Sequence, residues 1–186
     1  MKKIIGLVML MFLLSVSKVQ AVDFNNYTDD IKVLSALEVL DNIGSSDVFD
    51  RLDESSTRII FYDLSLMSFS YAKHYAVSST DESGNNYILI NEKYRNAPKE
   101  AIACLIAHES VHSLSKATLD EEVRATTTEA QTWLKLSGRI DVGMNDGLVN
   151  RENRLARMYK MSTSRQNLIK DSIVSNNFYQ RQLALN

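Results

Sequence analysis

The chain has 186 residues, 21 of them basic and 23 acidic, with a formal net charge of −2. This length is sufficient for one domain with a buried core, and the absence of a basic block argues against nucleic acid as a partner. Cys104 is the only cysteine, which excludes a disulfide within the chain, and Pro98 is the only proline, so no flexible linker is indicated.

The first 21 residues resemble a secretory signal peptide. Lys2 and Lys3 precede an apolar run of 13 residues, Ile4 to Val16, which is short for a membrane span, and a small-residue segment follows up to Ala21. We expect cleavage after Ala21, a mature single domain over residues 22–186 in the periplasm or outside the cell, and no stable membrane anchor. An uncleaved anchor is the alternative.

Helical spacing of apolar residues predicts a first helix from Asp30 to Ile43, which Gly44 ends. Ser46 is placed to cap a short second helix. The β-branched and aromatic residues from Thr57 to Tyr62 predict a strand. Two further strands are expected over residues 75–79 and 87–91, joined as a hairpin. A pair of helices is expected next, over 96–115 and 118–138. After a loop that ends at residue 147, two C-terminal helices are expected over 148–160 and 164–185. The fold class is therefore α+β, with a small antiparallel sheet.

His108, Glu109 and His112 form the sequence H-E-S-V-H on the third of these helices. Side chains four residues apart lie on one face of a helix, so both imidazoles can reach one metal ion. The glutamate between them can take a proton from metal-bound water, which is the chemistry of the HExxH zinc motif. The motif predicts a metal-dependent hydrolase. Cys104, one turn before His108, could offer a thiol, but a buried structural role is favoured.

With a strand pair before the motif helix and Glu122-Val-Arg-Ala125 opening the next one, the chain resembles small bacterial HExxH zinc metallopeptidases of the gluzincin kind. The resemblance covers about residues 58–138. It implies one zinc ion, a glutamate on the second helix as third ligand, and a peptide or protein substrate that pairs with an edge strand, either 75–79 or 87–91 here.

Two adjacent carboxylates, Glu121 and Glu122, compete for the role of third ligand. Glu121 is the fourth residue of a capping box that begins at Thr118, so its side chain is expected to bond the backbone at the helix start. Glu122 instead begins a stripe that continues through Ala125 along one helix face. We therefore predict His108, His112 and Glu122 as metal ligands, with Glu109 as the general base.

Related enzymes often carry an aspartate that orients a metal-binding histidine; here Thr126 stands in its place, and Glu129 is the alternative. His74 is expected at the surface, with the cleft as the alternative, and Tyr179 is a weaker candidate for stabilising the oxyanion. Trp133 is expected in the core. Two other classes stay open: a secreted zinc-binding module that has lost catalysis and binds a partner, and an accessory domain in which the motif is accidental.

Overall fold

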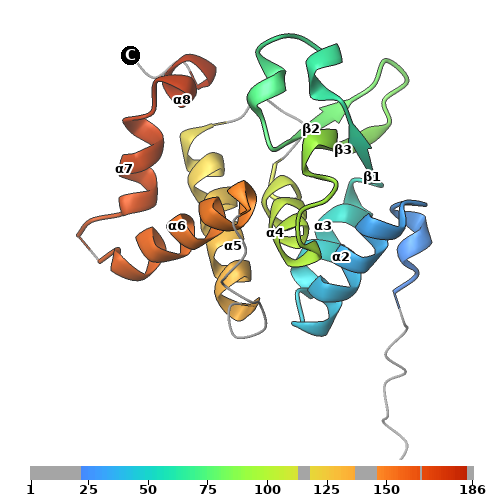
Figure 1. Cartoon of the computed structure of the whole chain (residues 1–186), viewed down its shortest axis with the longest axis horizontal. Coiled ribbons are helices and arrows are strands. Elements are labelled where there is room, and N and C mark those ends of the chain that lie inside the picture. Colours follow the sequence, from blue (N-terminus) through green and yellow to red (C-terminus); the bar gives the residue numbers. More distant parts are fainter. Residues whose placement is uncertain (1–21, 113–117, 137–145, 164, 184–186) are drawn as a thin grey trace, which may run out of the picture.

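The structure is a computed structural model that describes residues 22–112, 118–136, 146–163 and 165–183. The predicted signal peptide, the end of the predicted motif helix and most of the predicted loop before residue 147 lie outside these ranges. Within them, the chain forms an α+β domain with a single small sheet (Figure 1). None of its described helices is both long enough and apolar enough to cross a membrane.

Helix α4 (Lys99–Glu109) is the centre of the domain and packs against α2, α5 and the sheet. Every residue from Ala101 to Glu109 is buried. This explains the nearly unbroken apolar run in its sequence, because a helix covered on all sides needs no polar face. The motif residues at its C-terminal end are therefore anchored in the main core.

The N-terminal helices agree with the sequence prediction. Helix α2 (Ile31–Asn42) is capped by Asp30, whose side chain accepts hydrogen bonds from two backbone N–H groups, and it ends before Gly44, which adopts a φ of +70°. Helix α3 (Ser46–Glu54) follows at once. Its N-cap is Ser45 rather than the predicted Ser46, and no side-chain hydrogen bond supports it. Helix α2 packs on α4, and the buried residues of α3 belong to the same core.

The sheet has the strand order β1-β3-β2, formed by Arg58–Tyr62, Asn86–Asn91 and Ala76–Thr80 respectively. The predicted hairpin is present, since β2 and β3 are antiparallel. The prediction of a fully antiparallel sheet was wrong, because β1 runs parallel to β3. The segment between β1 and β2, which includes η2 (Leu64–Leu66) and η3 (Tyr71–Lys73), carries the chain across the sheet, so β3 becomes the central strand.

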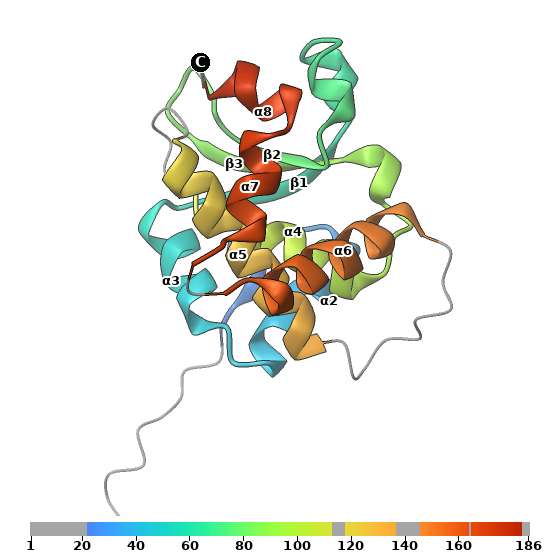
Figure 2. The ribbon, with the colours of Figure 1, turned by 90° about the vertical axis from the view of Figure 1, so that its left-hand side faces the viewer.

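The second half of the chain is helical and covers one side of α4. Helices α5 (Leu119–Leu136) and α6 (Gly147–Met161) pack on each other, and α7 (Leu168–Val174) and α8 (Asn177–Gln182) complete this side (Figures 1 and 2). The predicted single helix over residues 164–185 is in fact two helices. Asn167 and Asn176 cap them separately, because each side chain accepts a backbone N–H at the start of its helix.

Candidate metal centre and cleft

A cleft of about 740 Å³ lies between α4, α5, β2 and the C-terminal helices. All four predicted site residues line it: His108, Glu109, His112 and Glu122. Its volume is within the range of clefts that hold small ligands or a few residues of a peptide. Strand β2 forms one wall with its free edge, and helices α6 to α8 form the opposite wall.

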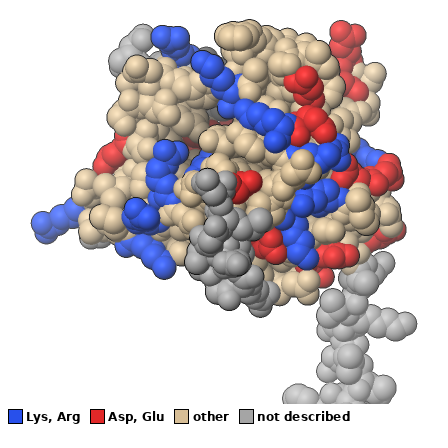
Figure 3. Space-filling view, viewed as in Figure 1, with Lys and Arg blue, Asp and Glu red and all other residues tan. Residues whose placement is uncertain are grey.

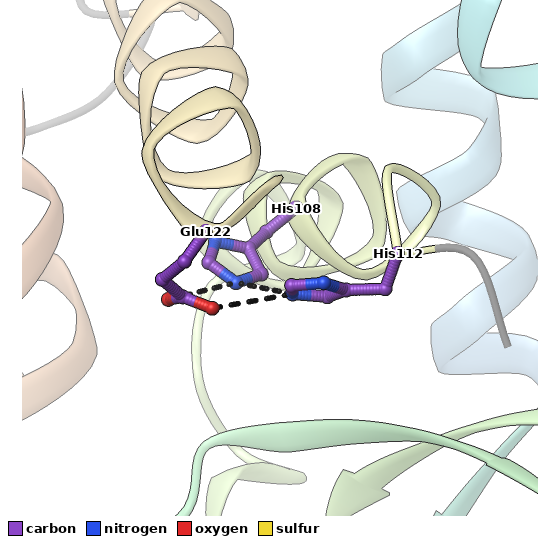
Figure 4. A group of neighbouring side chains, drawn as sticks. All are labelled: His108, His112 and Glu122. Atoms are coloured by element: carbon purple, nitrogen blue, oxygen red, sulfur yellow. Dashed lines mark hydrogen bonds and ion pairs between the residues drawn. The ribbon is translucent and has the colours of Figure 1, made fainter. Parts of the chain in front are cut away.

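Two imidazole nitrogens and the carboxylate of Glu122 converge in the cleft (Figure 4). The Nε2 atoms of His108 and His112 are 3.2 Å apart. The Glu122 carboxylate oxygens lie 3.7 Å from His108 Nε2 and 3.5 Å from His112 Nε2. Two of these residues are buried, and among the described residues no fourth His, Cys, Asp or Glu joins the group. The three side chains could hold a metal ion.

The separation of the two imidazole nitrogens is close to that expected in a tetrahedral zinc site. A zinc ion with ligand bonds of about 2.05 Å places its ligand atoms roughly 3.3 Å apart, from tetrahedral geometry. The pair of imidazole nitrogens is slightly shorter than this value. The nearest Glu122 oxygen is Oε1 for His108 and Oε2 for His112, and each lies slightly further away than this value. Two imidazoles and one carboxylate are also a donor set that zinc accepts in catalytic sites, where three protein ligands leave a fourth position open.

The local chain path to His112 differs from the prediction of a continuous helix to Ser115. Helix α4 ends at Glu109, and Val111 and His112 donate their N–H groups three residues back, to His108 and Glu109. Ser110 accounts for the change, because its hydroxyl donates to the Ala107 carbonyl that would otherwise accept from Val111. The tighter turn still brings His112 beside His108.

Glu129 is the residue that orients His108. Its carboxylate lies 2.9 Å from His108 Nδ1 and is fully buried. An imidazole that donates from Nδ1 leaves the lone pair of Nε2 for a metal ion, and a carboxylate partner makes that nitrogen more basic. Of the two candidates for this role, the structure therefore supports Glu129. The hydroxyl of Thr126 is buried and has no hydrogen-bond partner among the described residues.

Arg151 of α6 links this carboxylate to a second buried one. Its guanidinium pairs with Glu129 and with Glu152, and it stacks over the Tyr75 ring at 4.5 Å. Burial raises the pKa of Glu152 to about 7, although Arg151 acts in the opposite direction. Sequence reasoning missed this network. One signal was available, because Glu152 falls on the apolar stripe of its helix, where a charge must be paired.

Glu109 is held by the sheet. Its carboxylate Oε2 accepts a hydrogen bond of 3.0 Å from the hydroxyl of Ser78 in β2, and the residue is 7% exposed. The hydroxyl also lies 3.0 Å from the Glu109 backbone carbonyl. Glu109 is absent from the group of three ligand atoms but faces the same cleft, as a general base should. Ser78 was not predicted from the sequence, because only the folded sheet brings it to α4.

Tyr179, on helix α8, also lines the cleft. Burial and the neighbouring Glu122 carboxylate raise the pKa of its phenol, so the hydroxyl keeps its proton and can donate a hydrogen bond. His74 also lines the cleft, contrary to its expected surface position, and its ring packs against Phe178 at 4.8 Å. Burial lowers the pKa of His74, which favours the neutral imidazole.

The remaining candidates lie away from the ligand group. The N–H of Glu121 donates to the Thr118 hydroxyl at 3.2 Å, which is the hydroxyl half of the predicted capping box, while Glu122 faces the two histidines. Cys104 is fully buried in the core, and burial raises the pKa of its thiol. Trp133 is 1% exposed and donates to Asn153. The prediction that Cys104 and Trp133 are core residues is thus confirmed.

Comparison of the chain with protein-family models, with curated proteins and with solved structures finds no match.

Proposed function

We propose that the protein is an exported zinc-dependent peptidase. In this proposal His108, His112 and Glu122 hold one zinc ion, and Glu109 is the general base. The observation that carries it is the convergence of one ligand atom from each of three residues, all within 4.8 Å of one another, beside the buried carboxylate of Glu109 in an open cleft. A purely structural zinc site would need a fourth protein ligand.

Each neighbouring side chain has a chemical part in the proposed reaction. When bound, zinc supplies a Lewis acid that acidifies water and polarises the carbonyl oxygen of the substrate. Glu109 accepts the proton of the attacking water and passes it to the leaving amine, while the Ser78 hydroxyl fixes the orientation of its carboxylate. Tyr179 keeps its proton and donates to the negative charge that develops on the substrate oxygen.

The sheet supports a position for the peptide. Strand β3 is paired on both sides, whereas β2 is an edge strand whose residues line the cleft. Of the two strands considered, β2 is therefore the one that can accept an added strand of substrate through backbone hydrogen bonds. Ser78 places the middle of β2 against Glu109, so a peptide paired there would pass the proposed base.

Export is the part of the proposal that rests on the sequence alone. The basic start, apolar run and small-residue exit of residues 1–21 support a signal peptide, with a periplasmic or extracellular location. A hydrolase with a single buried cysteine is compatible with an oxidising compartment, because its thiol is inaccessible.

Replacing Glu109 by Gln tests the proposal. The amide preserves the shape of the side chain but cannot accept a proton, so kcat on a broad peptide library should fall by at least about 10²- to 10⁴-fold. Zinc content, measured by elemental analysis, should stay at one per chain. Glu100→Gln is the matched control, a carboxylate in the first turn of the same helix, and it should leave both values unchanged.

Unchanged turnover in Glu109→Gln would exclude the base. A wild-type chain that binds zinc but cleaves no peptide of the library would instead support the inactive zinc-binding module.

A further inference from the structure

The C-terminal helices differ in charge from the rest of the chain. Between residues 147 and 182 there are seven Lys or Arg residues and only two acidic ones, Glu152 and Asp171, whereas the whole chain has a net charge of −2. Acidic side chains gather toward the right of the face in Figure 3, and the side over the C-terminal helices is mainly basic or uncharged. These helices form one wall of the cleft.

Two cations that line the cleft have no partner among the described residues. Arg154 belongs to α6 and follows Arg151 by three residues, so both point from the same helix face, while Lys73 comes from η3 in the segment that precedes β2. Both side chains are exposed. Arg151 is neutralised by Glu129 and Glu152, but within the described residues neither Arg154 nor Lys73 makes an ion pair or a side-chain hydrogen bond.

The cleft keeps a positive charge when its other charges are paired. With zinc bound as proposed, the two positive charges of the ion offset the carboxylates of Glu109 and Glu122. No other acidic side chain lines the cleft among the described residues. Arg151 faces two carboxylates, Glu129 and Glu152, which leave at most one negative charge in excess. The two charges of Arg154 and Lys73 exceed it, so the cleft stays positive, in a concave site where charges attract ligands more strongly than on an open surface.

Thr126 adds a hydrogen-bonding group to the same cleft. Its hydroxyl is buried, lines the cleft and has no partner among the described residues. A buried hydroxyl without a partner costs free energy unless water or a ligand satisfies it. A hydroxyl and a guanidinium together are suited to the oxygens of a carboxylate.

We propose, on the basis of the proposed peptidase function, that the cleft selects substrates with a carboxylate close to the scissile bond. Arg154 is the main specificity-determining residue in this inference, and Lys73 acts from the other wall. Arg154 follows Arg151 by three residues, a rise of about 4.5 Å along α6, and Arg151 is connected through Glu129 to the ligand His108.

Matched quenched peptides test the selection. One series carries Glu, Gln or Lys at a single position within two residues of the cleaved bond and has an amidated C-terminus. A second series carries Gln there and a free C-terminus, which distinguishes a side-chain carboxylate from an α-carboxylate. For the wild-type chain, kcat/KM for the carboxylate peptides should exceed kcat/KM for the neutral Gln peptide with an amidated C-terminus by roughly tenfold, mostly through a lower KM. This ratio of the two kcat/KM values should fall as the salt concentration rises.

Variants assign the effect to its residue. Arg154→Gln should bring the ratio of Glu to Gln peptides close to one, and Arg154→Glu should favour the Lys peptide. Arg157→Gln is the control, because Arg157 is an exposed arginine on the same helix that does not line the cleft, and it should keep the wild-type ratio. Equal kcat/KM for the Glu, Gln and free-carboxylate peptides, or a preference that survives in Arg154→Gln and Lys73→Gln, would overturn the inference.

A binding assay separates this inference from the peptidase proposal. Fluorescence anisotropy of the same peptides with zinc-loaded Glu109→Gln protein measures affinity without cleavage. A carboxylate peptide that binds roughly tenfold more tightly than its amide would support the carboxylate site even if the wild type hydrolyses nothing. Equal affinities, or no measurable binding of either peptide, would overturn it even if the wild type is an active peptidase.

Discussion

Replacing Glu129 by Gln should weaken zinc binding although no ligand is removed. The carboxylate is fully buried and bonds His108 Nδ1 at 2.9 Å. A Gln side chain can still accept that N–H, but it lacks the charge that makes His108 Nε2 more basic and that balances Arg151. Loss of such an outer partner costs about 10- to 100-fold in metal affinity, or about 1.4 to 2.7 kcal/mol.

A competition titration with a chromogenic zinc chelator measures this change at fixed pH. Thr126→Val is the matched control, because it alters the rival candidate on the same helix and removes a hydroxyl that has no partner among the described residues. Its zinc affinity should equal that of the wild type. Equal affinities for wild type and Glu129→Gln, or a loss confined to Thr126→Val, would refute the assignment of Glu129.

Four further substitutions give three separate tests. Glu122→Ala should lose zinc in elemental analysis, whereas Glu121→Ala should keep it and lose only about 1 kcal/mol of helix-capping stability; the reverse result would assign the ligand to Glu121. Tyr179→Phe should lower kcat by about 10²-fold with one zinc retained, and an unchanged kcat would exclude the hydroxyl as donor. Burial raises the pKa of Glu152 in the folded chain from its ordinary value of 4.5 to about 7, so its contribution to stability is complete below pH 4.5 and is lost as pH rises through 7. Between pH 4.5 and 7, the free energy of unfolding of the metal-free chain should change by about 3 kcal/mol less in Glu152→Gln than in the wild type, as measured by chemical denaturation. Identical pH profiles of the two proteins would contradict the shifted pKa.

Local signals in the sequence were sufficient for most elements. Asp30 and Gly44 bound α2 because the cap and the positive φ are properties of single residues. The direction of β1 could not be predicted, because residue patterns specify which faces of a strand are buried but not its neighbour's direction. The early end of α4 depends on the side-chain hydrogen bond of Ser110, which competes with the helix.

In the candidate site too, residues close in the sequence could be predicted, whereas residues brought together by packing could not. His108, Glu109 and His112 were found because they are close in the sequence, and Glu122 because its neighbour Glu121 belongs to a cap. Partners from other elements were missed or given little weight. Ser78, Arg151 and Tyr179 come from β2, α6 and α8, and only the packing of these elements on α4 and α5 places them at the cleft.

The central claim is that one zinc ion at His108, His112 and Glu122 makes the protein a peptidase. The most direct measurement is peptide turnover as zinc is titrated into the metal-free chain of residues 22–186. Turnover should be absent without metal, rise linearly with added zinc and level off at one equivalent. Turnover that persists in the metal-free chain, or a chain that binds one equivalent of zinc and remains inactive, would contradict the claim.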